Sequence, residues 1–201
     1  MRQGYYMQKK ETVIVCRLTS SHQKESIKVF KPLSDLMREE IFLAISEMFE
    51  SSGGRSMLKS TGDIYIKPNG ISNKPYCYTR PEVVEAVIRY WKNAGARDIY
   101  LFENATQGNI TRMVYELTGY GEVCRRLGAK QVFLDELKNV SFTFNGKQKE
   151  ENEDGGYHST TFDIPEFVVN RLIENKDENL YINLPKLKTP LIFNTQCDIC
   201  H

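Results

Sequence analysis

The chain has 201 residues, enough for one domain with a sizeable core. Its 27 Lys and Arg side chains nearly balance 26 Asp and Glu, and the net charge of +1 excludes the global basic field that drives binding to nucleic acid or to a membrane surface. Because 40% of the residues are hydrophobic and 26% are charged, we expect residues 1–201 to form a single globular domain.

The amino-terminal residues lack the apolar core of a secretory signal, and no run reaches the roughly 20 apolar residues of a membrane span. We therefore expect a cytoplasmic protein with no membrane partner, in which residues 1–10 form a flexible tail. The chain has five cysteines, an odd number, and it is large enough to fold without disulfides. Reduced thiols are therefore favoured.

Apolar residues recur at helical spacing in several parts of the chain. The predicted helices cover residues 34–50, 81–94, 110–117, 122–127 and 164–175. Ser34 is a cap candidate for the first, and Pro81 and Gly95 bound the second. Asp163 and Pro165 open the last.

Short apolar runs closed by polar residues predict strands. The predicted strands cover residues 63–67, 98–103, 131–135 and 179–183, with a further β-branched run at 12–18. Apolar runs without strict alternation are typical of parallel strands that are buried on both faces. The first three strands begin about 35 residues apart with a helical stripe in each gap, which is the spacing of βα units.

The longer gap before the last strand contains an insertion. Residues 140–144 and much of 157–162 alternate apolar and polar side chains, which predicts a β-hairpin. Residues 146–156 between them are charged and contain no large apolar residue, so we expect a solvated loop, with an acidic docking role as the alternative. The fold class is therefore α/β: an open, mainly parallel sheet with helices on both faces, plus a β-hairpin insertion.

Polar side chains follow each buried run, and in open parallel sheets ligands bind beyond the carboxyl ends of the strands. The candidate ligand-binding residues are Lys67, Asn69, Glu103, Asn104, Lys186 and Lys188. A lysine fixed at a strand end beside a helix N-terminus supplies a point charge and free backbone N–H donors, which suits a small anion. The alternative is an ordinary solvated turn, since Lys67 precedes Pro-Asn-Gly.

Several nucleotide and catalytic motifs are absent from the sequence. Gly119-Tyr-Gly121 begins like a dinucleotide fingerprint, but Cys124 stands where the third glycine belongs and no strand precedes the motif. No GxxxxGK[ST] loop occurs, and three scattered histidines form no metal trio or Ser-His-Asp set. The reaction, if there is one, is therefore not specified by a motif, and no catalytic residue is assigned.

The chain ends in Cys197-Asp-Ile-Cys200-His201. Cys-x-x-Cys-His is the sequence motif for c-type haem attachment, but haem attachment requires export, for which no signal is present. Cys-x-x-Cys alone also serves zinc, iron–sulfur and redox pairs, so Cys197 and Cys200 are candidate metal ligands. We expect the pair to be dispensable for folding, because chain ends are poorly ordered unless docked.

A series of motifs carries a resemblance to a known family. In order they are Lys67-Pro68-Asn69, residues 80–87 (RPEVVEAV), residues 93–97 (NAGAR), residues 118–120 (TGY), residues 127–129 (LGA) and residues 182–189 (INLPKLKT). Together they closely resemble domain of unknown function 362, whose members are often described as iron–sulfur cluster-binding proteins. The resemblance implies an iron–sulfur cluster as a cofactor, but no cysteine of this chain matches the family's cluster ligands.

The sequence departs from the family pattern in two ways. Arg80 and Pro190 stand where the family carries histidine, and family members continue well beyond the Lys-Leu-Lys-Thr motif. We therefore expect a domain truncated at its carboxyl end, with residues 190–201 as an irregular tail. An uncovered sheet edge near residues 179–183 would then favour self-association.

Three functions remain open at this point. The leading hypothesis is a domain that binds a small anionic substrate or cofactor at the strand ends, in a redox system. The alternatives are a partial, non-catalytic fragment of such a protein and an iron–sulfur or metal module that uses Cys197 and Cys200.

Overall fold

The computed structural model describes Ile14, Cys16 and residues 32–74, 77–105, 109–143 and 161–186. The predicted tail at 1–10, the loop at 146–156 and the tail at 190–201 lie outside these residues. Ile14 and Cys16 are the described residues of the run at 12–18, and neither lies in a strand, so this prediction is not confirmed.

Four parallel strands form the central sheet, in the order β3-β2-β1-β6. The strands are β1 (Asp63–Pro68), β2 (Asp98–Glu103), β3 (Lys130–Phe133) and β6 (Leu180–Leu184). A separate antiparallel hairpin joins β4 (Asn139–Thr143) to β5 (Thr161–Pro165). The α/β fold with a hairpin insertion is thus confirmed.

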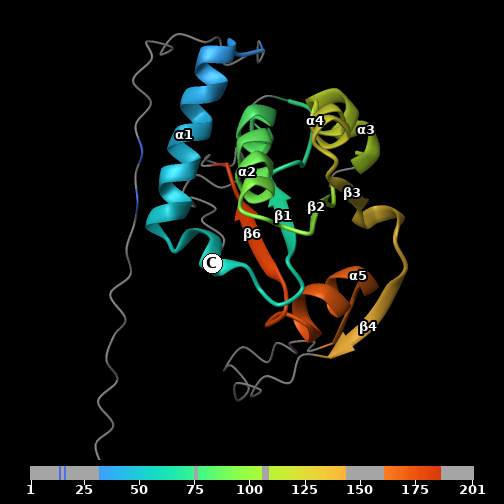
Figure 1. The fold of residues 1–201 in the computed structure, drawn as a ribbon. Helices are drawn as coiled ribbons and strands as arrows, with labels where there is room; N and C mark the ends of the chain where they lie inside the picture. The colour runs from blue at the N-terminus through green and yellow to red at the C-terminus, as the bar shows by residue number, and fades with distance from the viewer. Residues whose placement is uncertain are drawn as a thin grey trace, which may run out of the picture.

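Helices cover both faces of the sheet (Figure 1). They are α1 (Asp35–Ser51), α2 (Pro81–Asn93), α3 (Thr111–Thr118), α4 (Tyr120–Leu127), α5 (Glu166–Val168) and a π-helical turn, η4 (Val169–Glu174). Short 3₁₀ turns follow α1 (Gly54–Met57) and β3 (Leu134–Glu136).

Successive side chains of each strand point to opposite faces of the sheet, so the strands contribute to two separate apolar cores. Ile64 and Ile66 point toward α2 and α4, whereas Tyr65 points to the opposite face and stacks on Tyr100 at a ring-centroid distance of 4.9 Å. Phe167, beside Tyr65, brings the α5 segment onto that second face. Three successive residues of β1 are therefore fully buried, as a parallel strand covered on both sides requires.

Two sequence-based boundaries at the junction of the hairpin and the last helix were wrong, and the strand predicted at 131–135 ends at Phe133, after which a 3₁₀ turn begins. The second hairpin strand runs to Pro165, and the helix begins at Glu166 rather than at residue 164. The reason is pairing: Ile164 lies opposite Val140 and Asp163 opposite Ser141 in the hairpin ladder, so these residues complete the strand before the chain turns into the helix.

The side chains of the last strand, β6, are less buried than its apolar sequence predicted. Leu180 and Ile182 are buried, but Tyr181 between them is 46% exposed. Tyr181 pairs in register with Tyr65 yet lies at the edge of the sheet, where its ring contacts Phe102 but remains largely outside the cover of the α5 segment.

Candidate ligand site at the carboxyl edge of the sheet

The strand order reverses between β1 and β6. From β1 the chain adds β2 and then β3 in one direction, and it then returns to place β6 on the other side of β1. In an open parallel sheet, the carboxyl ends of the two strands at such a reversal flank the crevice where ligands bind. Lys67 and Asn183 are paired there, and Lys186 follows β6 by two residues.

Lys67 and Glu103 form an ion pair at this edge. The Lys67 ammonium nitrogen lies 3.2 Å from each carboxylate oxygen of Glu103, which ends the neighbouring strand β2. The Glu103 side chain is buried, whereas the Lys67 side chain is 37% exposed. The carboxylate therefore holds the lysine at the strand end, while part of the lysine remains accessible to solvent.

Two backbone amides also hold the Glu103 carboxylate. Gly70 N donates to one oxygen at 3.0 Å and Asn104 N to the other at 2.9 Å. Burial raises the pKa of Glu103 above its ordinary value, although Lys67 and these two amides favour the charged form. A Cβ at position 70 would lie 3.1 Å from Glu103 Cγ, so glycine permits the close approach of the loop.

The loop after β1 is tied to the end of β6 through Thr79. Its hydroxyl accepts from Asn69 N at 3.1 Å and donates to the Leu184 carbonyl at 2.8 Å. The buried Tyr120 hydroxyl contacts the carbonyl oxygens of both Asn69 and Thr79, at 2.9 and 2.6 Å. These hydrogen bonds connect the loop after β1 to the end of β6, the two sides of the strand-order reversal.

Other acidic groups near the strand ends serve the fold. Asp135 accepts from Thr111 N at 3.0 Å and so caps α3, whose preceding loop is held by the Thr111 hydroxyl. Glu136 forms a two-pronged pair with Arg112. Among the described residues no group of three or more His, Cys, Asp or Glu side chains is arranged to hold a metal ion.

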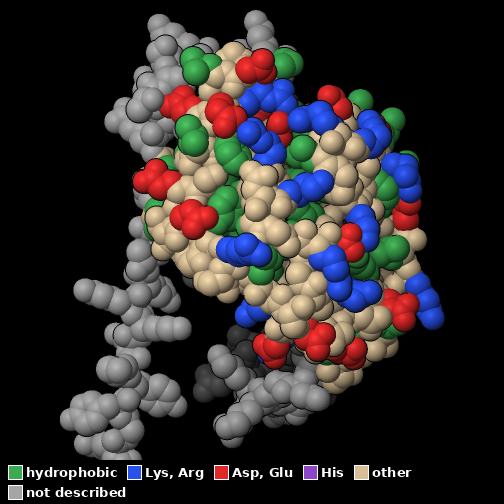
Figure 2. All heavy atoms as spheres, viewed as in Figure 1, with side chains coloured by type: hydrophobic (Ala, Val, Ile, Leu, Met, Phe, Trp, Pro, Cys, Tyr) green, Lys and Arg blue, Asp and Glu red, His purple; other side chains and the backbone are tan. Residues whose placement is uncertain are grey.

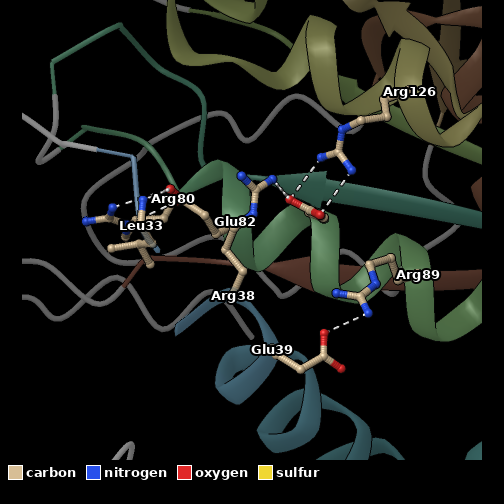
Figure 3. Close-up of polar contacts among 8 residues, drawn as sticks. Leu33, Arg38, Glu39, Arg80, Glu82, Arg89 and Arg126 are labelled. Atoms are coloured by element: carbon tan, nitrogen blue, oxygen red, sulfur yellow. Dashed lines mark hydrogen bonds and ion pairs between the residues drawn. The ribbon is translucent and has the colours of Figure 1, made fainter. Parts of the chain in front are cut away.

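A buried carboxylate lies in the first turn of α2. The buried Glu82 in its first turn accepts from Leu33 N at 3.3 Å and from Arg80 Nε at 3.2 Å (Figure 3). Arg80, where the resembling family carries histidine, is thus an ion-pair partner within this chain.

An ion-pair cluster that sequence analysis missed joins three helices. The Glu85 side chain of α2, 7% exposed, is paired with Arg38 of α1 and with Arg126 of α4 at 3.0–3.1 Å (Figure 3). Burial opposes ionisation, but the two arginines outweigh it and hold the pKa of Glu85 below its ordinary value. No sequence signal links residues so far apart in the chain.

The structure brings some of the predicted residues together. Lys67 and Glu103 are in contact, and Asn104 adjoins them through its backbone, with an exposed side chain. Asn69 and Lys186 are partly buried and follow the ends of β1 and β6. Lys188, Cys197, Cys200 and all three histidines lie outside the described residues.

The three cysteines that are described are free thiols. Cys124 is fully buried, and burial raises the pKa of its thiol to about 12, so it acts as an apolar core residue. No helix in the described part of the chain is long and apolar enough to cross a bilayer.

The fold and the strand-order reversal define an α/β protein with an open parallel sheet of the doubly wound type. A family model described as Domain of unknown function (DUF362) matches residues 64–191, from β1 through β6. The chain belongs to this family, as the resemblance indicated. No curated protein and no solved structure matches it.

Proposed function

We propose that the carboxyl edge of the sheet binds a small molecule bearing a phosphate or carboxylate group, with Lys67 as its main electrostatic contact. The main support for this proposal is the ion pair between Lys67 and the buried Glu103. This pair holds the partly exposed Lys67 at the strand-order reversal. An ammonium that is already positioned loses less side-chain entropy when an anion binds.

Several neighbouring groups support an anion at this position. Lys186 follows the other strand of the reversal, and Lys188 comes two residues later in the sequence. Asn69 and Asn104 follow the ends of β1 and β2 at the same edge, and in this proposal their side chains supply amide donors. Glu103 acts as a positioning residue, because its carboxylate is buried beneath the lysine and bound to backbone amides.

The ligand class includes both a small anionic substrate and an anionic cofactor of a redox reaction. The competing interpretation, a partial domain whose βα units persist without a completed site, predicts no such binding. To distinguish the binding site from the incomplete domain, we titrate the full chain with inorganic phosphate and with succinate and monitor the amide chemical shifts by NMR.

In the wild type we expect saturable shifts at Gly70 and Asn104. Lys67→Gln should weaken binding about tenfold, the effect of losing one directed charge. Lys59→Gln, an exposed lysine near the opposite end of β1, is the matched control and should bind as the wild type does.

Folding must be separated from binding, because Lys67→Gln leaves Glu103 buried without its cation. The double variant Lys67→Gln/Glu103→Gln removes that buried charge and keeps two groups able to hydrogen-bond each other. A folded double variant that binds either anion with wild-type affinity would contradict the proposal. So would a folded wild-type chain that binds neither anion.

A further inference from the structure

A cavity lies along the lateral edge of the sheet that is formed by β3, with β2 between it and the strand that carries Lys67. It encloses about 970 Å³ along the edge strand β3, and we call it the β3 slot. Its floor is Gln131, Val132 and Phe133. In Figure 1, β3 lies between α3 and α4 above and the α5 segment below.

The two layers of the fold form the walls of the slot. Arg112, Glu116 and Arg125 line it from α3 and α4, and Phe167, Asn170 and Arg171 line it from α5 and η4, which together form the α5 segment (residues 166–174). Phe133 packs toward the first wall, against Tyr115 at 5.1 Å, whereas Val132 belongs to the core on the other face. The edge strand therefore lies at the bottom of a channel between two layers.

The backbone of β3 has an unpaired side in the described part of the chain, because β3 pairs only with β2 there. Every second residue of a strand directs its N–H and C=O groups to the same side, so part of this ladder faces the slot. The side-chain oxygen of Gln131 is also buried without a hydrogen-bond partner among the described residues. The slot thus holds hydrogen-bonding groups that match those of an extended backbone.

The charges of the slot favour an acidic occupant. Arg112 is held by Glu136 and lies over Phe133 at 4.3 Å, and Arg125 is held by Glu116. Lys138 and Arg171 also line the slot, and neither forms an ion pair with a carboxylate in the described residues. With four cations and three carboxylates lining it, the slot keeps a positive excess. Figure 2 shows Lys and Arg side chains gathered on the side of the molecule that carries α3, α4 and β3.

We propose that the β3 slot binds an acidic peptide in extended conformation, which adds to β3 as a fifth strand of the sheet. A single strand fits between the walls, since neighbouring strands lie about 4.8 Å apart and packed layers about 10 Å apart. A second copy of this chain fits less well, because its β3 lies at the bottom of an identical channel and the walls would meet first. Backbone bonds then supply affinity, and alternate side chains supply selectivity.

The probe is an acetylated, amidated peptide of alternating Glu and Val, titrated into the full chain and followed by fluorescence anisotropy and by amide hydrogen exchange. We expect saturable binding and slower exchange of outward amides within residues 130–133. The same peptide with alternate amides N-methylated has equal charge but cannot complete the ladder, and it should bind at least about tenfold more weakly. Equal binding of the two peptides would overturn strand addition.

Charge reversal tests the choice of an acidic partner. Lys138→Glu/Arg171→Glu should weaken binding at least about tenfold while the melting temperature is maintained, because both side chains are exposed. The control Lys59→Glu/Lys176→Glu makes the same change in net charge at exposed lysines outside the slot. An equal loss of peptide affinity in both double variants would show that only the net charge of the chain matters, and it would overturn the proposal. A peptide of alternating Lys and Val that binds as tightly as the Glu and Val peptide would also overturn it. Concentration-dependent protection of β3 without peptide would show that the occupant is a second copy.

Discussion

Two buried carboxylates, Glu85 and Glu103, have pKa values displaced in opposite directions. Glu103 meets one lysine and two backbone amides, and burial prevails, so its pKa is raised. Glu85 meets two arginines, which overcome the effect of burial and lower its pKa. A raised carboxyl pKa contributes stability at low pH that is lost as pH rises, whereas a lowered one contributes stability that is lost as pH falls.

Glu85→Gln should lower the free energy of unfolding by about 1–3 kcal/mol at pH 7, because it removes charge-assisted bonds to two helices. Since the folded pKa of Glu85 is depressed, the difference from wild type should shrink as pH falls below about 4, where the carboxylate becomes protonated. Urea unfolding at several pH values measures this. Glu39→Gln, which breaks the more exposed pair with Arg89 at 2.9 Å, is the control and should cost less than about 1 kcal/mol. A pH-independent difference for Glu85→Gln would contradict the assignment.

Thr79→Val tests the connection between the loop after β1 and the end of β6. The substitution preserves shape but leaves Asn69 N and the Leu184 carbonyl without their hydroxyl partner, at a cost of about 1–3 kcal/mol. Thr118 is also buried, but its hydroxyl bonds only to carbonyls of its own helix, so Thr118→Val should cost less. Thermal unfolding of both variants provides the comparison. Equal losses would mean that the Thr79 hydroxyl has no special structural role.

At the scale of elements, helix α1 is attached to the domain chiefly through α2. Met37 and Ile41 are its buried residues, and they pack with Leu33 and Ala86. Leu36 and Leu43 on the same helix are 78% and 61% exposed. Phe42, Ile45 and Phe49 of α1 are partly buried and pack against the main core. The attachment therefore combines an apolar contact along the helix with the Arg38–Glu85 pair.

Ile41→Ala should destabilise the chain by about 2–4 kcal/mol, because it removes buried methyl groups and leaves a cavity between α1 and α2. Leu43→Ala makes a similar change at an exposed position and should stay within about 0.5 kcal/mol of wild type. Denaturant unfolding monitored by far-UV circular dichroism gives both values. If only α1 amides lose protection in hydrogen exchange while the sheet is unaffected, α1 unfolds as a separate unit.

At the scale of the whole molecule, we expect the partly uncovered edge at β6 to mediate self-association. Its ladder has no second partner strand in the described residues, and Tyr181 exposes an aromatic ring beside it. We expect concentration-dependent association in sedimentation velocity, which Tyr181→Lys should reduce. Phe162→Lys places the same charge on the hairpin, at a residue that is 50% exposed, and should leave association unchanged. A wild-type chain that sediments as a monomer at all concentrations would exclude this interface.

Much of the fold was predictable because it follows from local patterns. Apolar runs identified all four strands of the main sheet, and the helical stripes between the first three, at regular spacing, required parallel neighbours. The hairpin boundary was missed because Asp163 and Pro165 favour a helix start locally, while pairing with β4 keeps them in a strand. Of the site, Lys67 and Glu103 were predicted to share an edge, but their contact depends on the register of β1 against β2.

The sequence by itself determined the class of fold and the placement of polar residues at strand ends, since both depend on periodicity and on the order of segments along the chain. Only the tertiary structure decided which charges meet. Glu85 forms ion pairs with arginines from two other helices, and Asp135 caps α3. The edge strand β3 lies recessed between two layers. Such contacts arise from packing among distant segments, where burial and the need to pair buried charges select partners that no local pattern encodes.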